Sequence, residues 1–576
     1  MKMKNKAIIC GLMAVASAIT GCTDMLEKEP LDSTADNPLF WNNEANMENY
    51  ANTFYDNFPG YNGKFYTNAL TDDQITTGFS NWKYVNIPAE SSEWSSAWTE
   101  IRRANAMINS INNYATGVDD ATKQYWIGVA RLNRAMQYWD LVRKFGDCTY
   151  LEKVLDVDDP ELYGERQNRD EVMDKVLEDL NAAVASITPS SSKRTWSQEM
   201  ANAMKAHICL WEGTFRKYRS ETDGQDAKDL EGAERFLKEA VTACEAVMGS
   251  GNGYSLCDDY QAIYNSESLD NNTEIIFYKQ YVKDVLTHSL IANTSSSSEQ
   301  SGMSKDAFDN YLFLDGKPKA TTSYDTDDAG VMAVSETDGK EHLDISAQLA
   351  VRDKRLSQTI DHIVCYAGRD WPRTSDGMGM TSASGYTVCK YDNTSIPLEY
   401  RKAGNYTCAP IYWLAVIYLN YAEAKAELAD MGSGTIIQQD LDMTVNKLRQ
   451  RAGLPDMSVT PDVDPANNMG VSNLLWEIRR ERRCELMFDD DIRYWDLIRW
   501  HKLDLLDNGK YPDITIGANL KNEPSPDLSK IKLTSDGYLD GQNGIRHYEY
   551  KHYFYPIPSS QITLNPKLGQ NPGWTE

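Results

Sequence analysis

The sequence predicts an all-α protein in which helix pairs stack into one body, with a loop-rich ligand-binding region that contains minor β-structure. Two observations support this fold class. Near both ends of the chain, apolar residues recur every three or four positions, which is the pattern of amphipathic helices. Between Gly249 and Cys408 this pattern gives way to clusters of Ser, Thr, Gly and Asp, which are typical of loops. A loop region this long is expected in a compact domain where it serves function.

The clearest predicted helix covers residues 124–145. Its apolar stripe consists of Trp126, Val129, Leu132, Met136, Trp139 and Val142. Gly146 follows in the position favoured after a last helical turn. A helix over 94–111 precedes it, so the two form a helical hairpin.

Further helices of similar length follow along the chain. Their predicted ranges are 170–187, 198–218, 233–248, 412–428, 441–451, 474–488 and 492–501. Because each pair alone exposes an apolar face, we expect degenerate helix-turn-helix repeats that bury these faces by stacking. A short strand is predicted at 275–277.

The N-terminus has the pattern of a lipoprotein signal peptide. A basic stretch, Lys2 to Lys6, precedes the apolar residues 7–20, which form a segment too short to span a bilayer as a helix. The small residues Thr20 and Gly21 then lead directly to Cys22, which we predict to be the lipid-bearing cysteine. The alternative is an ordinary secretory signal with an incidental cysteine. Two or three acyl chains on Cys22 would give a stable membrane anchor.

These patterns divide the chain into five parts. They are a signal peptide (1–21), an N-terminal helical-repeat part (22–250), a loop-rich ligand-face region (251–407), a C-terminal helical part (408–503) and a loop-rich C-terminal segment (504–576). We expect residues 22–576 to form one compact domain.

Composition and motifs exclude several classes of function. A net charge of -27 repels nucleic acid phosphates and leaves no basic patch for anionic lipid. No CxxC pair indicates a zinc site, and no G-x-S-x-G, H-E-x-x-H or phosphate-binding glycine loop indicates catalysis. We therefore predict no enzyme activity, no cofactor and no metal. The eight cysteines after Cys22 are widely spaced, which favours buried thiols. We expect one or two disulfides at most, and the sequence leaves their pairing open.

Several strings along the chain resemble, in the same order, those of the SusD/RagB family of surface nutrient-binding lipoproteins. They are ARLNRA at 130–135, DLVRKFGD at 140–147, LNYAEA at 419–424, LRQRAGL at 448–454, IRRERRCEL at 478–486, RYWDLIRW at 493–500, YPIP at 555–558 and NP at 565–566. Together with Cys22 they cover the mature chain from end to end.

The resemblance implies tetratricopeptide-like helix pairs that support a variable, loop-built ligand face. It also implies a location on the outer membrane facing the exterior, with a SusC-like TonB-dependent transporter as partner. Family members pass oligosaccharides, or in some cases peptides, to that transporter. We therefore expect an oligosaccharide-binding lipoprotein held in outer-membrane lipid through Cys22. A peptide or protein-derived nutrient binder on the same fold is the first alternative, and a helical glycoside hydrolase is the remote one.

One departure from the family pattern lies near the start of the helix predicted at 412–428. Family members often have Arg where this chain has Trp413 and Glu where it has Val416. Positions three apart share a helix face, so the pair of charges is replaced by apolar contact. Any partner contact made through that pair in the family would be altered in this chain.

Candidate glycan-binding residues were sought among aromatic rings, which stack on sugars, and polar groups, which bind hydroxyls. A first set lies in 70–84: Asp72, Asp73, Trp82 and Tyr84. Trp82 has polar neighbours in a loop, so we expect a solvent-facing ring, with a lid over the core as the alternative.

A second set lies in the loop-rich region. Trp371 follows Arg369 and Asp370, and a glycine-rich run leads on to Tyr386, so we expect an exposed platform with flanking donors. The alternative is a ring that clamps loops together. Tyr281, after the predicted strand, is a further candidate.

Two charged motifs are assigned structural roles. The run Arg479 to Arg483 has arginine and glutamate at helical spacing and is predicted to brace packed helices. Asp325 to Glu336 partly matches the spacing of a calcium-binding loop, but Ala329 occupies a ligand position, so we predict an acidic surface loop.

Overall fold

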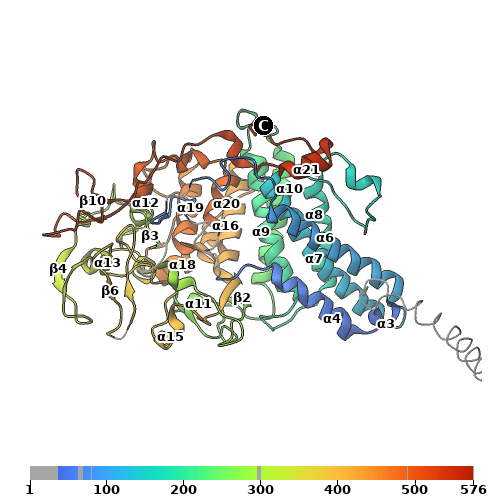
Figure 1. Cartoon of the computed structure of the whole chain (residues 1–576), viewed down its shortest axis with the longest axis horizontal. Helices are drawn as coiled ribbons and strands as arrows, with labels where there is room; N and C mark the ends of the chain where they lie inside the picture. Colours follow the sequence, from blue (N-terminus) through green and yellow to red (C-terminus); the bar gives the residue numbers. More distant parts are fainter. Residues whose placement is uncertain are drawn as a thin grey trace, which may run out of the picture.

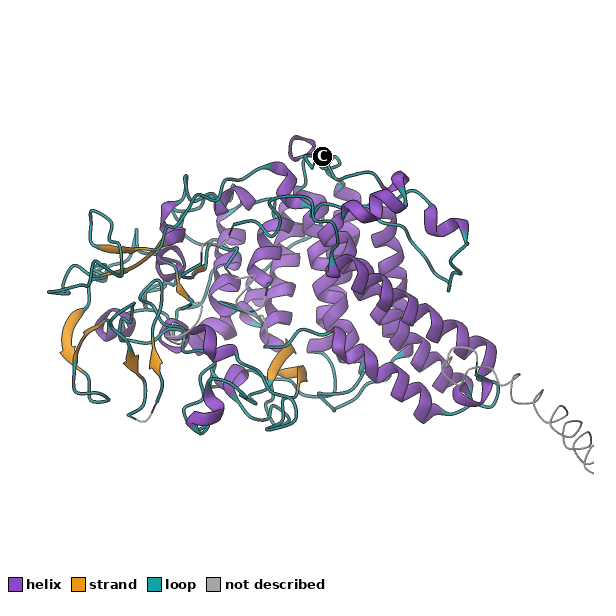
Figure 2. Ribbon diagram, in the orientation of Figure 1, coloured by secondary structure: helices purple, strands orange, loops and turns teal. Residues whose placement is uncertain are grey.

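The protein is described by a computed structural model over residues 37–61, 69–78, 81–294, 300–375, 377–489 and 491–574. Helices dominate the molecule, and short strands lie mainly toward one end (Figures 1 and 2). The predicted all-α class with minor β-structure is therefore confirmed. Cys22 lies outside the described residues.

The N-terminal half is a stack of long helices (Figure 1). They are α6 (Ser92–Tyr114), α7 (Asp120–Phe145), α8 (Arg169–Ser186), α9 (Gln198–Tyr218) and α10 (Leu230–Met248), preceded by α3 (Pro38–Trp41) and α4 (Glu44–Asn52). Each of α6 to α9 packs against the next helix along the chain. This arrangement confirms the predicted helix pairs, and the predicted helix ends agree with the observed ones to within four residues.

Local sequence explains where α7 begins and ends. The Asp119 carboxylate accepts the N–H of Thr122 at 3.0 Å and so satisfies a free donor of the first turn. At the other end Gly146 has φ of +71°, a conformation that side chains with a Cβ disfavour. The predicted stripe along α7 is buried except at Met136, which is partly buried.

A close approach of backbones joins α9 to α10. A Cβ on Gly213 would lie 2.7 Å from Cγ of Leu237 and 3.1 Å from the carbonyl oxygen of Ala233. Glycine at this position therefore lets the two helices pack more closely than any larger residue would allow.

The C-terminal helices pack against this stack through α16 and α20. They are α16 (Leu414–Asp430), α17 (Gln438–Asp442), α18 (Val445–Ala452), α19 (Asn473–Glu485), α20 (Ile492–Arg499) and α21 (Ser559–Leu564). Because α16 contacts α9 and α10 on one side and α18 and α19 on the other, it connects the two halves of the molecule.

Loops, short helices and, among the described residues, five two-stranded antiparallel sheets complete the molecule, mostly at the end away from the N-terminal helices (Figures 1 and 2). These short helices are α11 (Ala262–Asn265), α12 (Lys305–Asn310), α13 (Ser346–Ala350), α14 (Lys354–Thr359) and α15 (Leu398–Arg401). The sheets pair β1 (Gln74–Ile75) with β3 (Gly302–Met303), β2 (Ile275–Lys279) with β8 (Ala409–Trp413), β4 (Val331–Val334) with β5 (Glu341–Asp344), β6 (Trp371–Pro372) with β7 (Gly379–Met380), and β9 (Ile516–Asn519) with β10 (Tyr538–Asp540). The predicted strand at 275–277 is β2.

Buried ion pairs connect the C-terminal helices to one another. Arg479 of α19 lies 2.9 Å from Glu427 of α16, and Arg482 lies 2.7 Å from Asp496 of α20. Glu481 pairs with Arg355 at 2.6 Å. The bracing role predicted for 479–483 is therefore confirmed.

The structure also describes the cysteines and the acidic loop. All eight cysteines after Cys22 are free thiols, and seven of them are buried. Asp325 is exposed, and its carboxylate accepts the N–H of Asp327 at 3.0 Å. Within the described residues no group of acidic, histidine and cysteine side chains is arranged to hold a metal ion.

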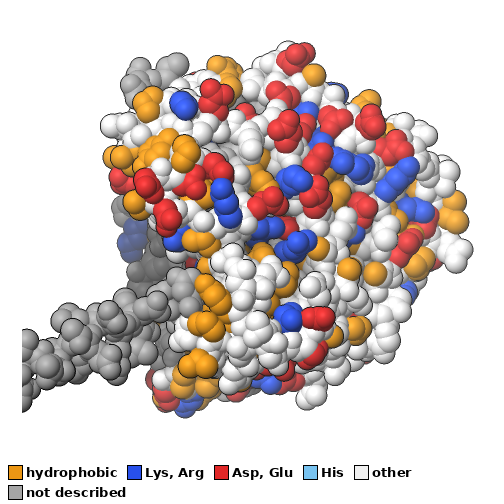
Figure 3. Space-filling view, turned by 90° about the vertical axis from the view of Figure 1, so that its right-hand side faces the viewer, with side chains coloured by type: hydrophobic (Ala, Val, Ile, Leu, Met, Phe, Trp, Pro, Cys, Tyr) orange, Lys and Arg blue, Asp and Glu red, His pale blue; other side chains and the backbone are white. Residues whose placement is uncertain are grey.

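The surface is strongly polar. Figure 3 shows one face on which acidic and basic side chains are interspersed, with apolar side chains scattered among them. None of the helices in the described ranges combines the length and the hydropathy that crossing a membrane requires.

Candidate functional site

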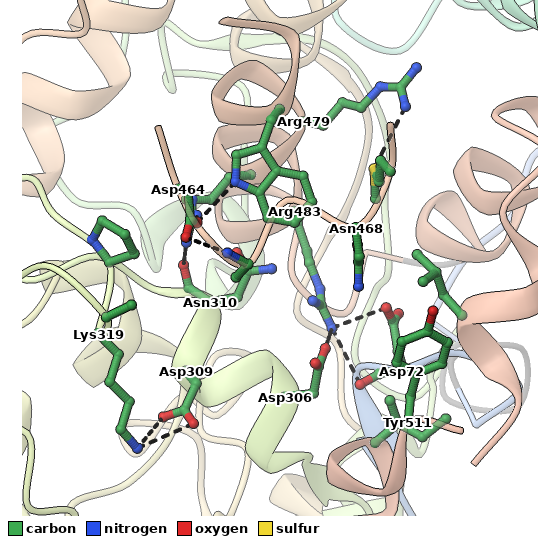
Figure 4. Close-up of a pocket in the computed structure, with 18 of the residues that line it drawn as sticks. Asp72, Asp306, Asp309, Asn310, Lys319, Asp464, Asn468, Arg479, Arg483 and Tyr511 are labelled. Atoms are coloured by element: carbon green, nitrogen blue, oxygen red, sulfur yellow. Dashed lines mark hydrogen bonds and ion pairs between the residues drawn. The ribbon is translucent and has the colours of Figure 1, made fainter. Parts of the chain in front are cut away.

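A cavity of about 360 Å³ opens between α12, α19, α20 and the loops around them, and we name it the charged cavity (Figure 4). Its lining comprises Asp72, Asp306, Asp309, Asn310, Pro318, Lys319, Ala320, Asp464, Ala466, Asn468, Met469, Trp476, Arg479, Arg480, Arg483, Arg493, Leu505, Tyr511 and Ile514. Its volume lies within the range of about 300–1,000 Å³ that is usual for small-molecule sites.

One wall is a single face of α19. Trp476, Arg480 and Arg483 follow one another at spacings of four and three residues, which places them along one face of the helix. The indole Nε1 of Trp476 donates to Asp464 at 3.0 Å, and Arg480 pairs with the same carboxylate. The loop that contains Asp464 is therefore held against the helix.

The opposite wall is α12. Ser304 caps this helix by accepting the N–H of Ala307 at 3.0 Å. Asp309 faces Lys319 across the cavity edge, with the two atoms Nζ and Oδ1 separated by 3.3 Å. Arg480 Nη1 donates to the carbonyl of Asn310 at 3.1 Å, which connects this wall to α19.

The floor is a cluster of carboxylates and arginines, which Figure 4 shows converging on Arg483. Arg493 donates to both oxygens of Asp72, at 2.9 and 2.6 Å. Arg483 donates to Asp73 at 2.7 Å and lies 2.8 Å from Asp306. Such bidentate and shared pairs fix the floor in one geometry.

Burial and the neighbouring arginines have opposite effects on the pKa values of the carboxylates in this floor. Burial alone raises the pKa of Asp72, but Arg483 and Arg493 outweigh it, so the pKa lies well below its usual range. For the buried Asp73, burial has the larger effect and raises the pKa, although Arg483 opposes it.

Several polar groups of the cavity are available to a ligand. Asn468 is exposed, and Lys319 and Tyr511 are partly exposed. Asn310 Oδ1 is buried, and no donor among the described residues reaches it. A ligand with many hydroxyls could accept from Lys319 and exchange hydrogen bonds with Asn468 while lying beside the partly exposed Tyr511 ring.

The structure places the residues of the first predicted set in different surroundings. Asp72 and Asp73 lie together at the charged cavity, where arginines hold both, and their direct role in binding stays a prediction. Trp82 is only 8% exposed, stacks on His552 at 4.1 Å and donates through Nε1 to the carbonyl of His547 at 2.8 Å. The expected solvent-facing ring is therefore wrong, because the C-terminal segment covers it.

Tyr84 and Tyr281 are also held by protein groups. Tyr84 is partly buried, and its hydroxyl donates to Glu93 at 3.1 Å. Tyr281 is buried, and its hydroxyl accepts the N–H of Tyr61 at 2.9 Å. Neither residue lines the charged cavity.

Other protein groups also cover the aromatic rings of the second predicted set. Trp371 is 5% exposed and donates to Ser335 Oγ at 2.7 Å, so the expected exposed platform is wrong and the loop-clamping alternative describes it. Tyr386 is buried with its ring stacked on Phe308 at 4.6 Å. Arg369 is partly exposed and pairs with Glu523 at 2.6 Å. A direct role of Arg369 in binding stays a prediction.

Sequence reasoning missed the residues that line the charged cavity from α19 and the loops. Trp476 lies one helical turn before Arg480, and this spacing could have indicated an aromatic ring beside the arginine run. Lys319 and Asn468 had no such signal, because only the fold brings their loops to the cavity.

Comparisons with known proteins agree with this architecture. A family model described as the SusD family matches residues 258–574, and one described as starch-binding associating with outer membrane matches residues 24–210. A SusD-like protein of Formosa agariphila is 27% identical over 224 residues, which are 36% of this chain and 43% of that protein. The aligned part is thus less than half of that relative.

Solved structures show the same fold. A SusD-like carbohydrate-binding protein of Bacteroides fragilis superposes with a TM-score of 0.68 at 22% identity and covers 92% of this chain and 99% of its own. A crystal structure with xylogluco-oligosaccharide superposes with a TM-score of 0.57 at 20% identity and covers 93% of this chain and 97% of its own.

The fold and the cavity together define a class of protein. It is built of helical repeats and has a hydrogen-bonding pocket between helices and loops. The family model that covers more than half of the sequence then identifies the family. This chain belongs to the SusD family.

Proposed function

We propose that the protein captures an oligosaccharide at the outer-membrane surface and passes it to a SusC-like TonB-dependent transporter. It is anchored in outer-membrane lipid through Cys22, faces the cell exterior and does not cleave its ligand. Family membership is the observation that carries this proposal, because the matched models and the similar structures are described as starch-binding and carbohydrate-binding proteins.

The charged cavity supports a binding role. It offers donors and acceptors on opposite walls, as sugar hydroxyls require, beside an indole and a phenol ring. Asp72, Asp306, Asp309 and Asp464 are each paired with an arginine or a lysine. Glycoside hydrolysis uses two carboxyls that act as acid and as nucleophile or base. Carboxylates already held by cations favour binding over hydrolysis.

The first test is electrophoresis of the lipid-free chain (residues after Cys22) in native gels cast with plant, microbial and host polysaccharides, with released sugar assayed in parallel. The variant Lys319→Ala/Asn468→Ala removes two ligand-accessible groups without touching the buried arginines. Lys175→Ala on α8, an exposed lysine far from the cavity in sequence, is the matched control. We expect retardation by one glycan in the wild type and the control, a loss in the double variant, and no released sugar.

Other outcomes would overturn parts of the proposal. Released sugar would contradict a non-catalytic role. If no polysaccharide retards the wild type and peptides bind instead, the ligand class is wrong and the peptide-binding alternative holds. The anchor is tested separately, because Cys22→Ala should abolish acyl labelling and release the protein from the membrane fraction.

A further inference from the structure

We propose that strand β4 is a self-association edge, to which a second copy of this chain adds its own β4 as an antiparallel strand. In the structure β4 pairs with β5 on one side only. Figure 1 shows β4 at the left-hand end of the molecule, away from the long N-terminal helices. We name the outer side of this strand the β4 edge.

The backbone groups of Met332 and Val334 point away from β5. At the turn of the hairpin, the N–H of Ser335 donates to the carbonyl of Lys340 at 2.8 Å. Bonded and non-bonded pairs alternate along an antiparallel ladder, so every second residue from Ser335 bonds to β5, and Met332 and Val334 lie at the positions between. Among the described residues, no other segment pairs with the backbone of either one.

The other side of β5, in contrast, is covered. The N–H of Val364 donates to the carbonyl of Leu343 at 2.9 Å, and Asp344 forms an antiparallel bridge with Ile363. The small sheet therefore continues beyond β5, whereas in the other direction it ends at β4.

The composition of this edge favours pairing with another strand. Residues 329–335 have no charged side chain. Val331 and Val334 are 59% and 64% exposed, and Met332 is partly exposed. Edge strands of natural proteins usually have a lysine, a proline or a bulge that prevents pairing with other chains. β4 has none of these, and its register with β5 is regular.

A second copy matches the β4 edge in one register. With a two-fold axis at Ala333, Met332 of each strand lies opposite Val334 of the other, so the outward N–H and C=O groups of all four residues pair and apolar side chains meet. A register that pairs Val334 with Gly330 is less favourable, because the Gly330 carbonyl already accepts the amide of Asn522 at 2.8 Å.

Charge repulsion weakens this pairing without preventing it. Each copy has a net charge of -27, but the acidic residues beside the edge, Glu341 and Asp344, lie on β5. The two β5 strands of the paired sheet would be three strand spacings apart, or about 14 Å. That separation exceeds the Debye length of about 8 Å at physiological ionic strength, so pairing should strengthen as salt is added.

The expected dimer is weak in solution. A pair of four-residue strands buries less than the roughly 1,200–2,000 Å² of a stable interface. Two copies anchored in one membrane would meet at a higher effective concentration, and the pair would present two charged cavities to one polysaccharide. This consequence rests on the proposed function, whereas the pairing itself does not.

Sedimentation velocity of the lipid-free chain tests the pairing, at concentrations of about 5–500 μM that detect a weak complex. Val334→Pro removes one outward N–H and leaves the bonds to β5 in place, since proline is tolerated where the N–H of an edge strand faces outward. Val334→Lys places a charge on the edge. Val285→Lys is the matched control, because this valine is 81% exposed in a different hairpin.

We expect the wild type and Val285→Lys to dimerise as concentration rises, and about threefold more tightly when NaCl increases from about 50 to 300 mM. Val334→Pro and Val334→Lys should each weaken pairing at least about tenfold, because each substitution acts twice across the two-fold axis. Thermal melts establish that the variants fold, and one variant remains as a test if the other does not. A wild type that is monomeric throughout, or a dimer that neither variant weakens, would overturn the proposal.

A cysteine trap tests the register. In Ala333→Cys the two new thiols face each other across the axis, with Cα atoms about 4.5 Å apart, a distance that a disulfide spans. In Val331→Cys the Cα atoms lie about 13 Å apart, which is too far. Mild oxidation should therefore link Ala333→Cys into dimers and leave Val331→Cys unlinked, and equal cross-linking of both would contradict the proposed pairing.

A peptide probe separates a second copy from another protein. If an unrelated valine- and threonine-rich peptide binds a monomeric wild type and Val334→Pro prevents this binding, the edge accepts strands of other proteins and the proposal is wrong. No glycan is present in these measurements, so their outcome is separate from the test of the proposed function.

Discussion

Replacing Arg483 with methionine should destabilise the protein strongly and in a pH-dependent way. Methionine keeps most of the side-chain volume and removes the charge that faces Asp72, Asp73 and Asp306. Arg493 still pairs with Asp72, but Asp73 and Asp306 lose the guanidinium that they contact at 2.7 and 2.8 Å. Removing one partner of a buried pair costs about 3–5 kcal/mol, since the remaining charge stays in a poorly solvated place.

The size of the effect on melting follows from the size of the protein. Unfolding entropy is about 2.1 cal/mol/K per residue, or about 1.1 kcal/mol/K for the roughly 520 residues that the structure describes. The expected free-energy loss in Arg483→Met therefore lowers the Tm by about 3–5 °C at pH 7.

The pH dependence has a definite sign. Burial already raises the pKa of Asp73 in the wild type, and removing Arg483 raises it further. A native state that binds more protons than the unfolded state gains stability as pH falls. The difference in Tm between Arg483→Met and the wild type should therefore shrink between pH 7 and pH 4. In the wild type, the lowered pKa of Asp72 acts in the opposite direction, because its stabilisation is lost as pH falls below about 3.8.

Calorimetric melts at pH 4, 5.5 and 7 test this reasoning. Arg131→Met is the control, because this arginine is 39% exposed and lies 4.0 Å from Asp179, so the expected change is under about 0.5 kcal/mol. Adding Asp73→Asn to Arg483→Met should recover part of the lost Tm. An equal loss at pH 4 and pH 7, or a loss no larger than that of the control, would refute the reasoning.

Three further predictions follow from particular contacts. Trp82→Ala should cost about 3–5 kcal/mol of stability, since its ring packs on His552 in the core; an unchanged Tm with weakened glycan retention would contradict this placement. Burial lowers the pKa of His552 to about 4, so stability is lost as pH falls from about 6.5 toward 4. Between pH 7 and pH 5, the free energy of unfolding of His552→Gln should therefore fall by about 2 kcal/mol less than that of the wild type. If denaturation shows the same fall in both proteins, that result would count against a buried neutral histidine. Gly213→Ala should cost about 1–3 kcal/mol in urea denaturation, because the new methyl would lie 2.7 Å from Leu237; unchanged stability would mean that α9 and α10 separate freely.

The helical body could be predicted because its signal is local. The stripe over 124–145 and the helix over 198–218 depend on residues three or four apart, and both helices are observed within four residues of the predicted ends. The bracing role of 479–483 could also be predicted from the sequence. Arginine and glutamate at helical spacing most often form ion pairs that connect packed helices.

The ligand face could not be predicted, because exposure depends on distant segments. Trp82 has polar neighbours in sequence, but His547 and His552, more than 460 residues away, cover its ring. In the sequence Asp72 is an ordinary loop carboxylate, and only the fold places Arg493 beside it. Trp413 and Val416, the two departures from the family pattern, both line a cavity of about 440 Å³ beside β8, which the sequence did not predict.

The pairing of Asp72 with Arg493 has a consequence for how the molecule is made. The two residues are separated by 421 positions, so the floor of the charged cavity can close only after nearly the whole chain is available. Contacts of such long range slow folding, because the entropy of closing the loop is lost before the contact forms. Asp72 and Asp73 therefore have no arginine partner until α19 and α20 have packed beside them. A chain truncated before α19 would lack both arginines of the floor and so could not form the charged cavity.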